Sequence, residues 1–383
     1  MNFEFATAGR ILLGRGTSQQ IPTLARDLGR RALVVLGGSG RGHEALTEGL
    51  SDSGVRPVVF NVGGEPTTHL VDRATAIARA EGCDLVISVG GGSVIDAGKA
   101  VAGLLANPGE VRDYLELVGG GRPLLNPGVP FVAAPTTAGT GAEVTRNAVL
   151  DVPEQKVKAS LRSPHLLARL AVVDPELTLS LPPAITAYTG MDALTQLIEP
   201  FVSNAANPLT DGICREGLTR AARSLARAYR DGSDVAARED MALAALFGGI
   251  ALANARLGAV HGFASVLGGA TGQAHGAICA RLLPFVMEAN IHAVGERGDP
   301  TIIQRYIEIA RTLTGDPEAD ARDGVSWVRG LCGEMDIPPL GVAGLSLTDC
   351  GRLIPLVQRA SSMQGNPVKL SDEELRGIVE ASL

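Results

Sequence analysis

The sequence predicts a two-domain protein in which a parallel α/β domain is followed by an all-helical domain. Three observations predict this fold class. The first half alternates short β-branched runs with helical patterns, whereas the second half runs in Ala- and Leu-rich helical segments with no convincing strand. A Pro-Pro pair, Pro182 and Pro183, separates the two patterns. We therefore expect domains at residues 1–180 and 181–383.

The first half contains five runs that each look like a strand buried on both faces and ending in a loop. Helical spacing of apolar residues lies between them, for example at 42–52 and 68–80. Strands joined in this way form a parallel sheet, and ligands of such sheets bind beyond the carboxyl ends of the strands. The predicted strands are 32–38, 57–64, 83–92, 129–137 and 170–174.

The composition excludes some classes of partner. Acidic residues outnumber basic ones, 41 to 34, and Lys and Arg form no long run, so we expect no binding to nucleic acid or to an anionic membrane. The first residues, MNFEFATAGRILLGRG, lack the pattern of a signal peptide, and no window of about 18 residues is apolar without a charge. We expect a cytoplasmic protein.

The five cysteines are an odd number, are widely spaced and form no CxxC pair. This spacing argues against a disulfide framework and against a zinc-thiolate site. We expect reduced thiols that are mostly buried.

A glycine-rich segment, SVGGGSVIDAGKA at 88–100, follows a predicted strand and precedes a predicted helix. Consecutive glycines let a phosphate approach the backbone, and the start of a helix favours its negative charge. The segment is not a Walker loop, because five residues separate Gly92 from Gly98 and Ala100 stands where Ser or Thr would bind magnesium. It is also not a GxGxxG motif. Alone, it fits a tight turn and a phosphate site equally well.

A second loop, PTTAGTGAEVT at 135–145, places the hydroxyls of Thr136, Thr137 and Thr140 beside glycines at another strand end. Two such loops on one sheet suit a pyrophosphate and its sugars better than a single phosphate. The pair therefore predicts a dinucleotide-binding domain.

The helical half contains a few polar groups among apolar neighbours. Asp192 alone could cap a helix start after Gly190, and His261 and His275 alone fit satisfied core positions. Together, the three form a two-histidine, one-carboxylate set that leaves positions open for substrate on Fe(II) or Zn(II). Gln196 follows Asp192 at i+4, so both lie on one helix face. Gln196 could therefore be a further ligand, a replacement for one, or packing.

With these motifs assembled, the chain resembles the iron-containing (group III) alcohol dehydrogenase family over essentially its whole length. The resemblance rests on several motifs in family order, which is far more specific than one glycine loop. They are GGGSVIDAGKA, PTTAGTGAEVT, DPELTLSLPPAITAYTGMDALTQLIE, VHGFASVLGGATGQAHGAICARLLP and GNPVKLSDEEL.

The resemblance implies a nucleotide-binding α/β domain and a helical domain with the active site in the cleft, a fold like that of dehydroquinate synthase, and a homodimer. It implies reversible hydride transfer between NAD or NADP and a small alcohol, aldehyde or ketone, with Fe or Zn acting as a Lewis acid. The implied metal ligands are Asp192, His261 and His275, with Gln196 as a possible fourth. The implied cofactor contacts are Gly37, Gly92, Ser93, Thr136, Thr140, Thr145, Asn147 and Lys158.

The chain departs from the family pattern at three positions. Gln196 stands where the family normally has a metal-binding histidine, and Ser265 stands where a further histidine is frequent. Gly37 replaces an aspartate that many members use to hold the adenosine ribose. A missing carboxylate removes repulsion against a 2′-phosphate, and Arg41 is close enough in sequence to pair with one. Gly37 therefore has two interpretations, a site that accepts NADP or a plain glycine turn.

Three alternatives remain open. A metal-free enzyme like the maleylacetate reductases would generally lack the aspartate present here as Asp192. A lyase like dehydroquinate synthase would need a basic cluster, and only Arg256 and Arg281 lie near in sequence. A non-catalytic nucleotide-binding protein would have lost its metal through Gln196.

Overall fold

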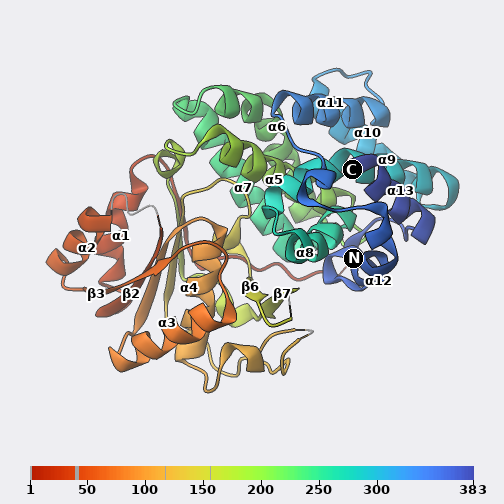
Figure 1. The fold of residues 1–383 in the computed structure, drawn as a ribbon. Helices are drawn as coiled ribbons and strands as arrows, with labels where there is room; N and C mark the ends of the chain where they lie inside the picture. The colour runs from red at the N-terminus through yellow and green to blue at the C-terminus, as the bar shows by residue number, and fades with distance from the viewer. Residues whose placement is uncertain (1, 39–42, 117, 156) are drawn as a thin grey trace. The chain divides into compact units, whose positions relative to one another are not determined.

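A computed structural model describes residues 2–38, 43–116, 118–155 and 157–383. The chain falls into two compact units. The sheet unit consists of Ala6–Thr137 and Gly141–Thr178, and the helical unit consists of Leu179–Leu383 with Ala138–Thr140 and the described part of Met1–Phe5. Figure 1 shows the elements of both. The boundary expected between residues 180 and 181 stays a prediction, since two short segments of the first half cluster with the helices.

The sheet unit is built on six strands in the order β1-β8-β5-β4-β2-β3, and every neighbouring pair is parallel. The fold class predicted from the sequence is confirmed. The strands are β1 (Ile11–Leu13), β2 (Arg31–Gly37), β3 (Arg56–Val62), β4 (Leu85–Gly90), β5 (Phe131–Pro135) and β8 (Leu170–Val173).

Helices cover both faces of the inner strands. Alternate residues of β2 pack with Ile21 of α1 (Ile21–Ala25) and Leu50 of α2 (His43–Asp52). The opposite face is covered by α4 (Gly92–Leu105), and α3 (Thr68–Ala80) packs against α4. Burial on both faces explains the unbroken apolar runs of β2, β4, β5 and β8.

Two expectations for this unit were wrong in detail. β3 is not buried on both faces, because it is the edge strand and leaves Val59 48% exposed. The sequence interpretation also missed β1, which is only three residues long, and an antiparallel hairpin of β6 (Asn147–Val152) and β7 (Val157–Arg162). Among the named strands of the described chain, β6 and β7 pair only with each other and do not join the main sheet. They therefore lack the unbroken apolar pattern by which the strands of the main sheet were predicted.

In the helical unit no strand occurs among the described residues, as the sequence predicts. Side-chain caps begin several helices, among them Asn207 before α6 and Ser371 before α13. The helices are α5 (Pro183–Val202), α6 (Pro208–Arg230), α7 (Val235–Ala255), α8 (Ala259–Thr271), α9 (His275–Arg297), α10 (Pro300–Thr314), α11 (Ala321–Glu334), α12 (Cys350–Arg359) and α13 (Asp372–Ser382).

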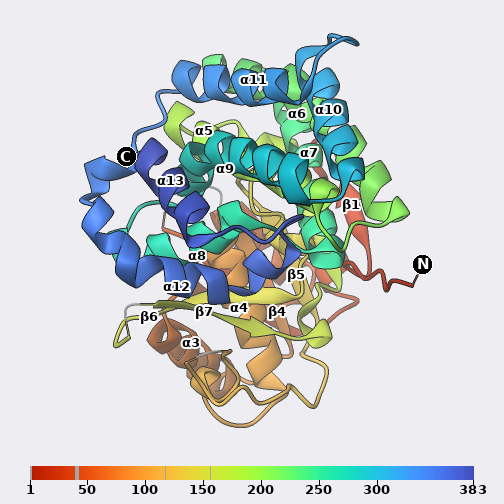
Figure 2. The same ribbon diagram turned by 90° about the vertical axis from the view of Figure 1, so that its right-hand side faces the viewer.

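The centre of the helical unit is α5, which packs against α6, α7 and α9 (Figures 1 and 2). Every residue from Gly190 to Val202 is buried. Two glycines allow this enclosure, since a Cβ at Gly190 would lie 2.2 Å from Leu225 and one at Gly217 would lie 2.4 Å from Leu197. Polar side chains on this part of α5 are therefore held away from water.

Helix α9 is, within the described part of the chain, the one single helix long and apolar enough to cross a membrane by length and composition. Its apolar window is 67% buried inside the structure, which is typical of a core helix. Helices α7 and α8 pass the same test only as a pair, and they bend by 101° at their break. All five cysteines are buried and free, as expected.

Candidate metal centre and nucleotide-binding edge

Helix α5 carries Asp192 and Gln196 one turn apart on the same buried face, each 2% exposed. The Gln196 Nε2 group donates to Asp192 Oδ2 at 2.9 Å and to the carbonyl of Gly139 at 3.3 Å. The alternative role of Asp192 as a helix cap is wrong, because α5 begins at Pro183 and Asp192 lies well inside it. Within the described residues, Oδ1 of this buried carboxylate accepts no hydrogen bond.

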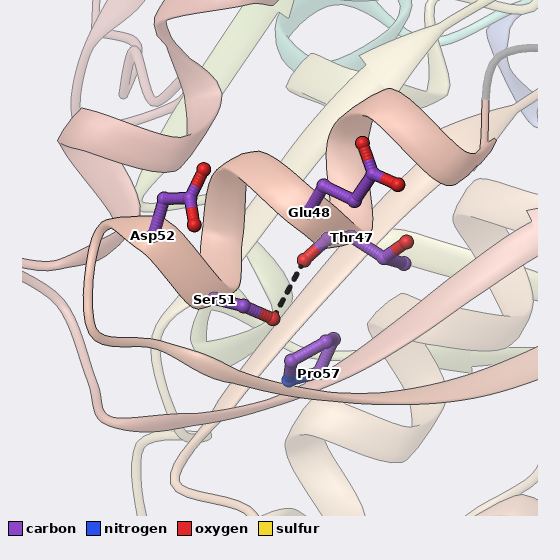
Figure 3. Close-up of a pocket in the computed structure, with 5 residues that line it drawn as sticks. All are labelled: Thr47, Glu48, Ser51, Asp52 and Pro57. Atoms are coloured by element: carbon purple, nitrogen blue, oxygen red, sulfur yellow. Dashed lines mark hydrogen bonds between the residues drawn. The ribbon is translucent and has the colours of Figure 1, made fainter.

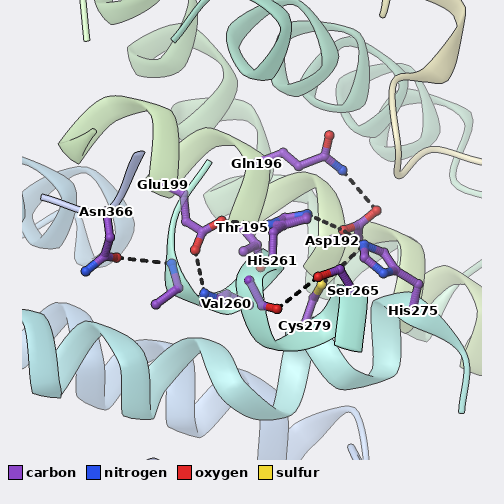
Figure 4. A network of polar contacts seen from close by, with 12 residues as sticks. Asp192, Thr195, Gln196, Glu199, Val260, His261, Ser265, His275, Cys279 and Asn366 are labelled. Carbon is purple, nitrogen blue, oxygen red and sulfur yellow. Dashed lines mark hydrogen bonds and ion pairs between the residues drawn. The ribbon is translucent and has the colours of Figure 1, made fainter. Parts of the chain in front are cut away.

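Helix α8 contributes His261, whose ring lies between two carboxylates of α5 (Figure 4). Its Nε2 lies 3.3 Å from Asp192 Oδ1, and its Nδ1 lies 2.7 Å from Glu199 Oε2. The other oxygen of Glu199 accepts the backbone N–H of Val260 at 2.7 Å. Glu199 therefore fixes the ring so that Nε2 faces Asp192.

Helix α9 begins at His275, and its first turn adds two more donors to the same place. His275 Nε2 lies 3.7 Å from Asp192 Oδ1, and Cys279 Sγ lies 3.6 Å from His275 Nε2. The donor atoms of Asp192, His261, His275 and Cys279 all lie within 4.8 Å of one another. The structure thus brings together the three residues predicted as ligands, from three different helices.

This donor set fits a divalent metal ion. A carboxylate, two imidazoles and a thiol are typical zinc ligands, and the two imidazoles also suit iron. Asp192 Oδ1 is buried and, within the described residues, accepts no hydrogen bond. A buried carboxylate oxygen that accepts no hydrogen bond is costly unless a cation, such as a metal ion or a protonated imidazole, satisfies it.

The charges of the site reinforce one another. Burial favours the neutral ring of His261, but Glu199 and Asp192 outweigh this and raise the pKa of His261 to about 9. Burial likewise opposes the charged form of Asp192, but His261 and His275 lower its pKa below the ordinary value. Burial and the same carboxylates raise the pKa of Cys279 well above its usual range. The site therefore favours a positive charge, which a proton on His261 supplies in the absence of a metal.

Sequence reasoning missed two residues of this site, Cys279 and Glu199. Cys279 follows His275 at i+4, the same spacing that drew attention to Gln196, but the cysteines were treated only as buried thiols. Glu199 lies on the same helix as Asp192, two turns further along. Ser265, which stands where the family often has a histidine, donates its hydroxyl to the carbonyl of Gly262 on its own helix.

In the sheet unit, four of the predicted cofactor residues meet at the carboxyl ends of neighbouring strands. Gly37 ends β2, Gly92 and Ser93 begin α4 directly after β4, and Thr136 follows β5. The chain leaves β2 for β3 on one side and returns to β4 on the other, so the strand order reverses between β2 and β4. Such a switch point is the usual ligand site of a doubly wound sheet.

The glycines of this edge serve close packing as well as ligand access. A Cβ at Gly98 would lie 1.9 Å from the hydroxyl of Ser88, so its absence lets α4 pack directly on β4. A Cβ at Gly90 would lie 2.5 Å from Val94. Among the described residues no side chain caps α4, whose N-cap is Gly91, and a phosphate at this helix start would meet the N–H groups of Gly92 and Ser93.

Two other predicted cofactor residues, Thr145 and Asn147, both contact a buried lysine. Lys99 is fully buried on α4, and its Nζ donates to Thr145 Oγ1 at 2.9 Å and to the carbonyl of Asn147 at 2.7 Å. Asp96 Oδ1 lies 3.3 Å from the same Nζ. Burial lowers the pKa of Lys99 and raises that of Asp96, and it raises the pKa of buried Glu143 to about 7.

The remaining predicted contacts are more scattered. Lys158 on β7 pairs with Glu65 at 3.1 Å. Thr140 belongs to the short segment that clusters with the helical unit. Arg41, the candidate partner of a 2′-phosphate, lies outside the described residues.

Figure 3 shows a surface hollow in the sheet unit, lined by Thr47, Glu48, Ser51, Asp52 and Pro57. It lies between the last turns of α2 and the start of β3, at the amino ends of the strands. The glycine loops lie at the opposite, carboxyl ends. Its two carboxylates also repel phosphate, so we assign it no part in cofactor binding.

Comparison with known proteins places the chain in a class. Residues 8–175 match the family model described as iron-containing alcohol dehydrogenase, and residues 186–383 match the C-terminal model of the same family. The chain therefore belongs to the iron-containing alcohol dehydrogenase family, and the predicted resemblance is confirmed.

Individual relatives support this placement. The chain is 38% identical over 377 residues to a 4-hydroxybutyrate dehydrogenase of Cupriavidus necator, covering 94% of this chain and 92% of the relative. The crystal structure of a 1,3-propanediol oxidoreductase superposes with a TM-score of 0.93 at 31% identity, over 100% of both chains. A sulfoacetaldehyde reductase from Bifidobacterium kashiwanohense in complex with NAD+ gives a TM-score of 0.88 at 28% identity, over 100% of this chain and 99% of that one.

Proposed function

We propose that the protein transfers a hydride between a short alcohol or aldehyde and NAD or NADP, with a divalent metal, Fe or Zn, held by Asp192, His261 and His275. The single observation that supports this most is the buried donor cluster, in which Asp192 Oδ1 faces two imidazoles and accepts no hydrogen bond from the described residues. A metal held there acts as a Lewis acid on the substrate oxygen.

The protein's own residues prepare this site. Asp192 offsets one of the two positive charges of the ion, and the amide of Gln196 occupies Asp192 Oδ2 so that Oδ1 stays turned to the imidazoles. Glu199 accepts the Nδ1 proton of His261, which leaves Nε2 unprotonated as a ligand. Burial excludes water from these groups and strengthens their interactions.

The cofactor is proposed to bind at the carboxyl edge of the sheet, with its pyrophosphate at the start of α4 near Gly92 and Ser93. Gly37 supplies no carboxylate at the end of β2, so nothing at that position repels a 2′-phosphate. A Gly37→Asp variant tests this point, because the new Cβ has room at 3.7 Å from Val94. We expect its relative kcat/KM for NADPH over NADH to fall; an unchanged ratio would show that Gly37 does not face the ribose.

The substrate class is inferred from the relatives. 4-Hydroxybutyrate and 1,3-propanediol, named in two of them, both carry a hydroxyl at the end of a short chain. We therefore propose a short terminal alcohol, or the aldehyde formed from it, for this protein. A homodimer and a cytoplasmic location remain predictions, and light scattering of the purified protein tests the first.

The decisive experiment is metal analysis together with NADH and NADPH oxidation over a panel of short aldehydes, before and after chelation. We expect activity to disappear with the metal and to return on adding Fe²⁺ or Zn²⁺. Activity that survives complete metal removal would favour a metal-free reductase, and cofactor binding without turnover would favour a non-catalytic protein. Asp192→Asn should lose the metal, whereas Asp211→Asn should keep it, because Asp211 pairs with Arg305 outside the cluster.

A further inference from the structure

The cluster of ligand atoms contains one donor more than the three assigned above, namely the thiol of Cys279. Cys279 lies one turn after His275 on α9 and is fully buried. Its Sγ is 3.6 Å from His275 Nε2, and its thiol interacts with the Asp192 carboxylate. The thiol therefore shares the space enclosed by the other three donors.

Three of the six distances between donor atoms in the cluster are close to those of a tetrahedral metal site, and the other three are at most 4.8 Å. With bonds of about 2.3 Å to sulfur and about 2.0 Å to nitrogen or oxygen, tetrahedral donors lie about 3.5 Å apart for S–N pairs and about 3.3 Å apart for N–O pairs. The observed separations are 3.6 Å from Cys279 Sγ to His275 Nε2, 3.3 Å from His261 Nε2 to Asp192 Oδ1, and 3.7 Å from His275 Nε2 to Asp192 Oδ1. The four donors therefore lie close enough together to hold one ion.

Gln196, the residue expected as a possible fourth ligand, presents the wrong atom. Its Nε2 donates to Asp192 Oδ2 (Figure 4) and to the carbonyl of Gly139. An amide NH₂ group donates hydrogen bonds and does not bind a metal ion. Turning the amide over would place Oε1 against both oxygens, so the two hydrogen bonds hold the present orientation.

We propose that the Cys279 thiolate is the fourth protein ligand of the metal and that Gln196 is a positioning residue for Asp192. The inference rests on the proposed function in requiring a metal at this cluster. As the metal–sulfur bond forms, the thiol proton leaves to solvent. One carboxylate and one thiolate then neutralise both charges of a divalent ion, and the soft thiolate favours Zn²⁺ or Fe²⁺ over Mg²⁺ and Mn²⁺.

Cobalt substitution of the wild-type protein tests this directly, because a Co²⁺–thiolate bond gives a charge-transfer absorption band in the near ultraviolet that nitrogen and oxygen ligands do not give. We expect the band on titrating the metal-free protein with Co²⁺. In Cys279→Ser the band should vanish and the affinity for Co²⁺ should fall at least about 10-fold. Losing a residue that only hydrogen-bonds to a metal ligand already costs about 10-fold in affinity, so losing a ligand should cost no less. Cys214→Ser, which changes another fully buried thiol of the helical unit, should keep both.

A second arm tests the role of Gln196. Gln196→Leu keeps the size of the side chain but removes both hydrogen-bond donors, so we expect the band to persist with a weaker affinity. If Cys279→Ser keeps its affinity for Co²⁺ while Gln196→Leu loses Co²⁺ binding, the proposal is overturned in favour of an amide ligand.

The outcomes separate this inference from the proposed function. If the wild-type protein binds Co²⁺ without the band, the thiolate ligand is wrong and the three-ligand metal site stands. If it binds no metal at all, the proposed function itself fails. Because the band is measured on the wild type, the test holds even if Cys279→Ser does not fold.

Discussion

Each of the two units buries a cluster of charged groups. The clusters differ in whether the charged atoms have hydrogen-bond partners within the protein. In the sheet unit, Lys99 is matched by Asp96, Thr145 and the carbonyl of Asn147. In the helical unit, the oxygen of Asp192 that faces the imidazoles accepts no hydrogen bond within the described residues. Burial alone therefore does not mark a functional site; a buried charge with an unmet hydrogen-bonding capacity is the better indication of a ligand.

The pKa shifts express the same contrast. Burial dominates in the sheet unit and moves Lys99, Asp96 and Glu143 toward their neutral forms, by lowering the pKa of the amine and raising those of the carboxyls. In the helical unit, mutual attraction overcomes burial, so the pKa of Asp192 is lowered and that of His261 is raised. The cluster of the helical unit keeps its side chains charged, which suits a metal site. The cluster of the sheet unit favours neutral side chains, which suits a structural role.

The largest expected effect comes from breaking the matched cluster. Lys99→Met removes the cation and leaves Asp96 and Glu143 without their partner, so we expect the free energy of unfolding to fall by about 3 kcal/mol, near the lower end for a broken buried pair. Urea unfolding measures this. Adding Asp96→Asn should recover part of the loss, and the metal content should not change. A loss of metal in Lys99→Met would show that the clusters are not independent.

An effect of similar size concerns Glu143, whose pKa is raised from 4.5 to about 7 in the folded protein. Between these values the folded protein binds more protons than the unfolded chain, so this group makes stability fall as pH rises from 4.5 and level off above 7. At 1.36 kcal/mol per pKa unit, the full effect is about 3 kcal/mol. In Glu143→Gln, the free energy of unfolding should lack this pH dependence when it is measured between pH 4.5 and 7.

Lys99 and Asp96 are present in both proteins, so the difference between wild type and Glu143→Gln reports the Glu143 carboxyl together with its interaction with Lys99. Parallel pH profiles for the two proteins would show that Glu143 is ionised in the fold.

The smallest of the three effects is expected for Glu199→Gln. A glutamine must turn its NH₂ group either to His261 Nδ1, which moves the ring proton to Nε2, or to the N–H of Val260, which pairs two donors. Either arrangement weakens the metal site, and we expect the affinity for Zn²⁺ to fall about 10- to 100-fold. A Zn²⁺ titration measures this, with thermal unfolding as the control for an intact fold. Unchanged affinity would mean that Glu199 does not orient the ring.

The sequence predicted the parts of the fold that carry strong periodic patterns. The buried runs of β2, β4 and β5 and the change to helices after Pro183 follow from burial, which leaves its mark on every residue of an element. The three-residue β1 and the β6–β7 hairpin were missed because short or half-exposed strands leave no such mark.

The candidate site was predictable where residue type alone indicates chemistry, as for Asp192, His261 and His275. It was not predictable where orientation decides the role. Gln196 lies on the expected helix face, but which end of its amide faces Asp192 depends on the carbonyl of Gly139, which is 57 residues away in sequence. Thr145 lies in a loop for which cofactor contact is predicted, and its hydroxyl also accepts a hydrogen bond from Lys99, 46 residues away, a contact that no sequence pattern indicates.

The central claim is that the helical cluster is built for one divalent ion. Titration of the metal-free wild-type protein with Zn²⁺, followed by calorimetry, tests it most directly. We predict one tight site per chain in the wild type, none in Asp192→Asn, and release of protons on binding as the thiol and imidazolium give way to the metal. A wild-type protein that binds no Zn²⁺, or binds it equally well without the Asp192 carboxylate, would contradict the account.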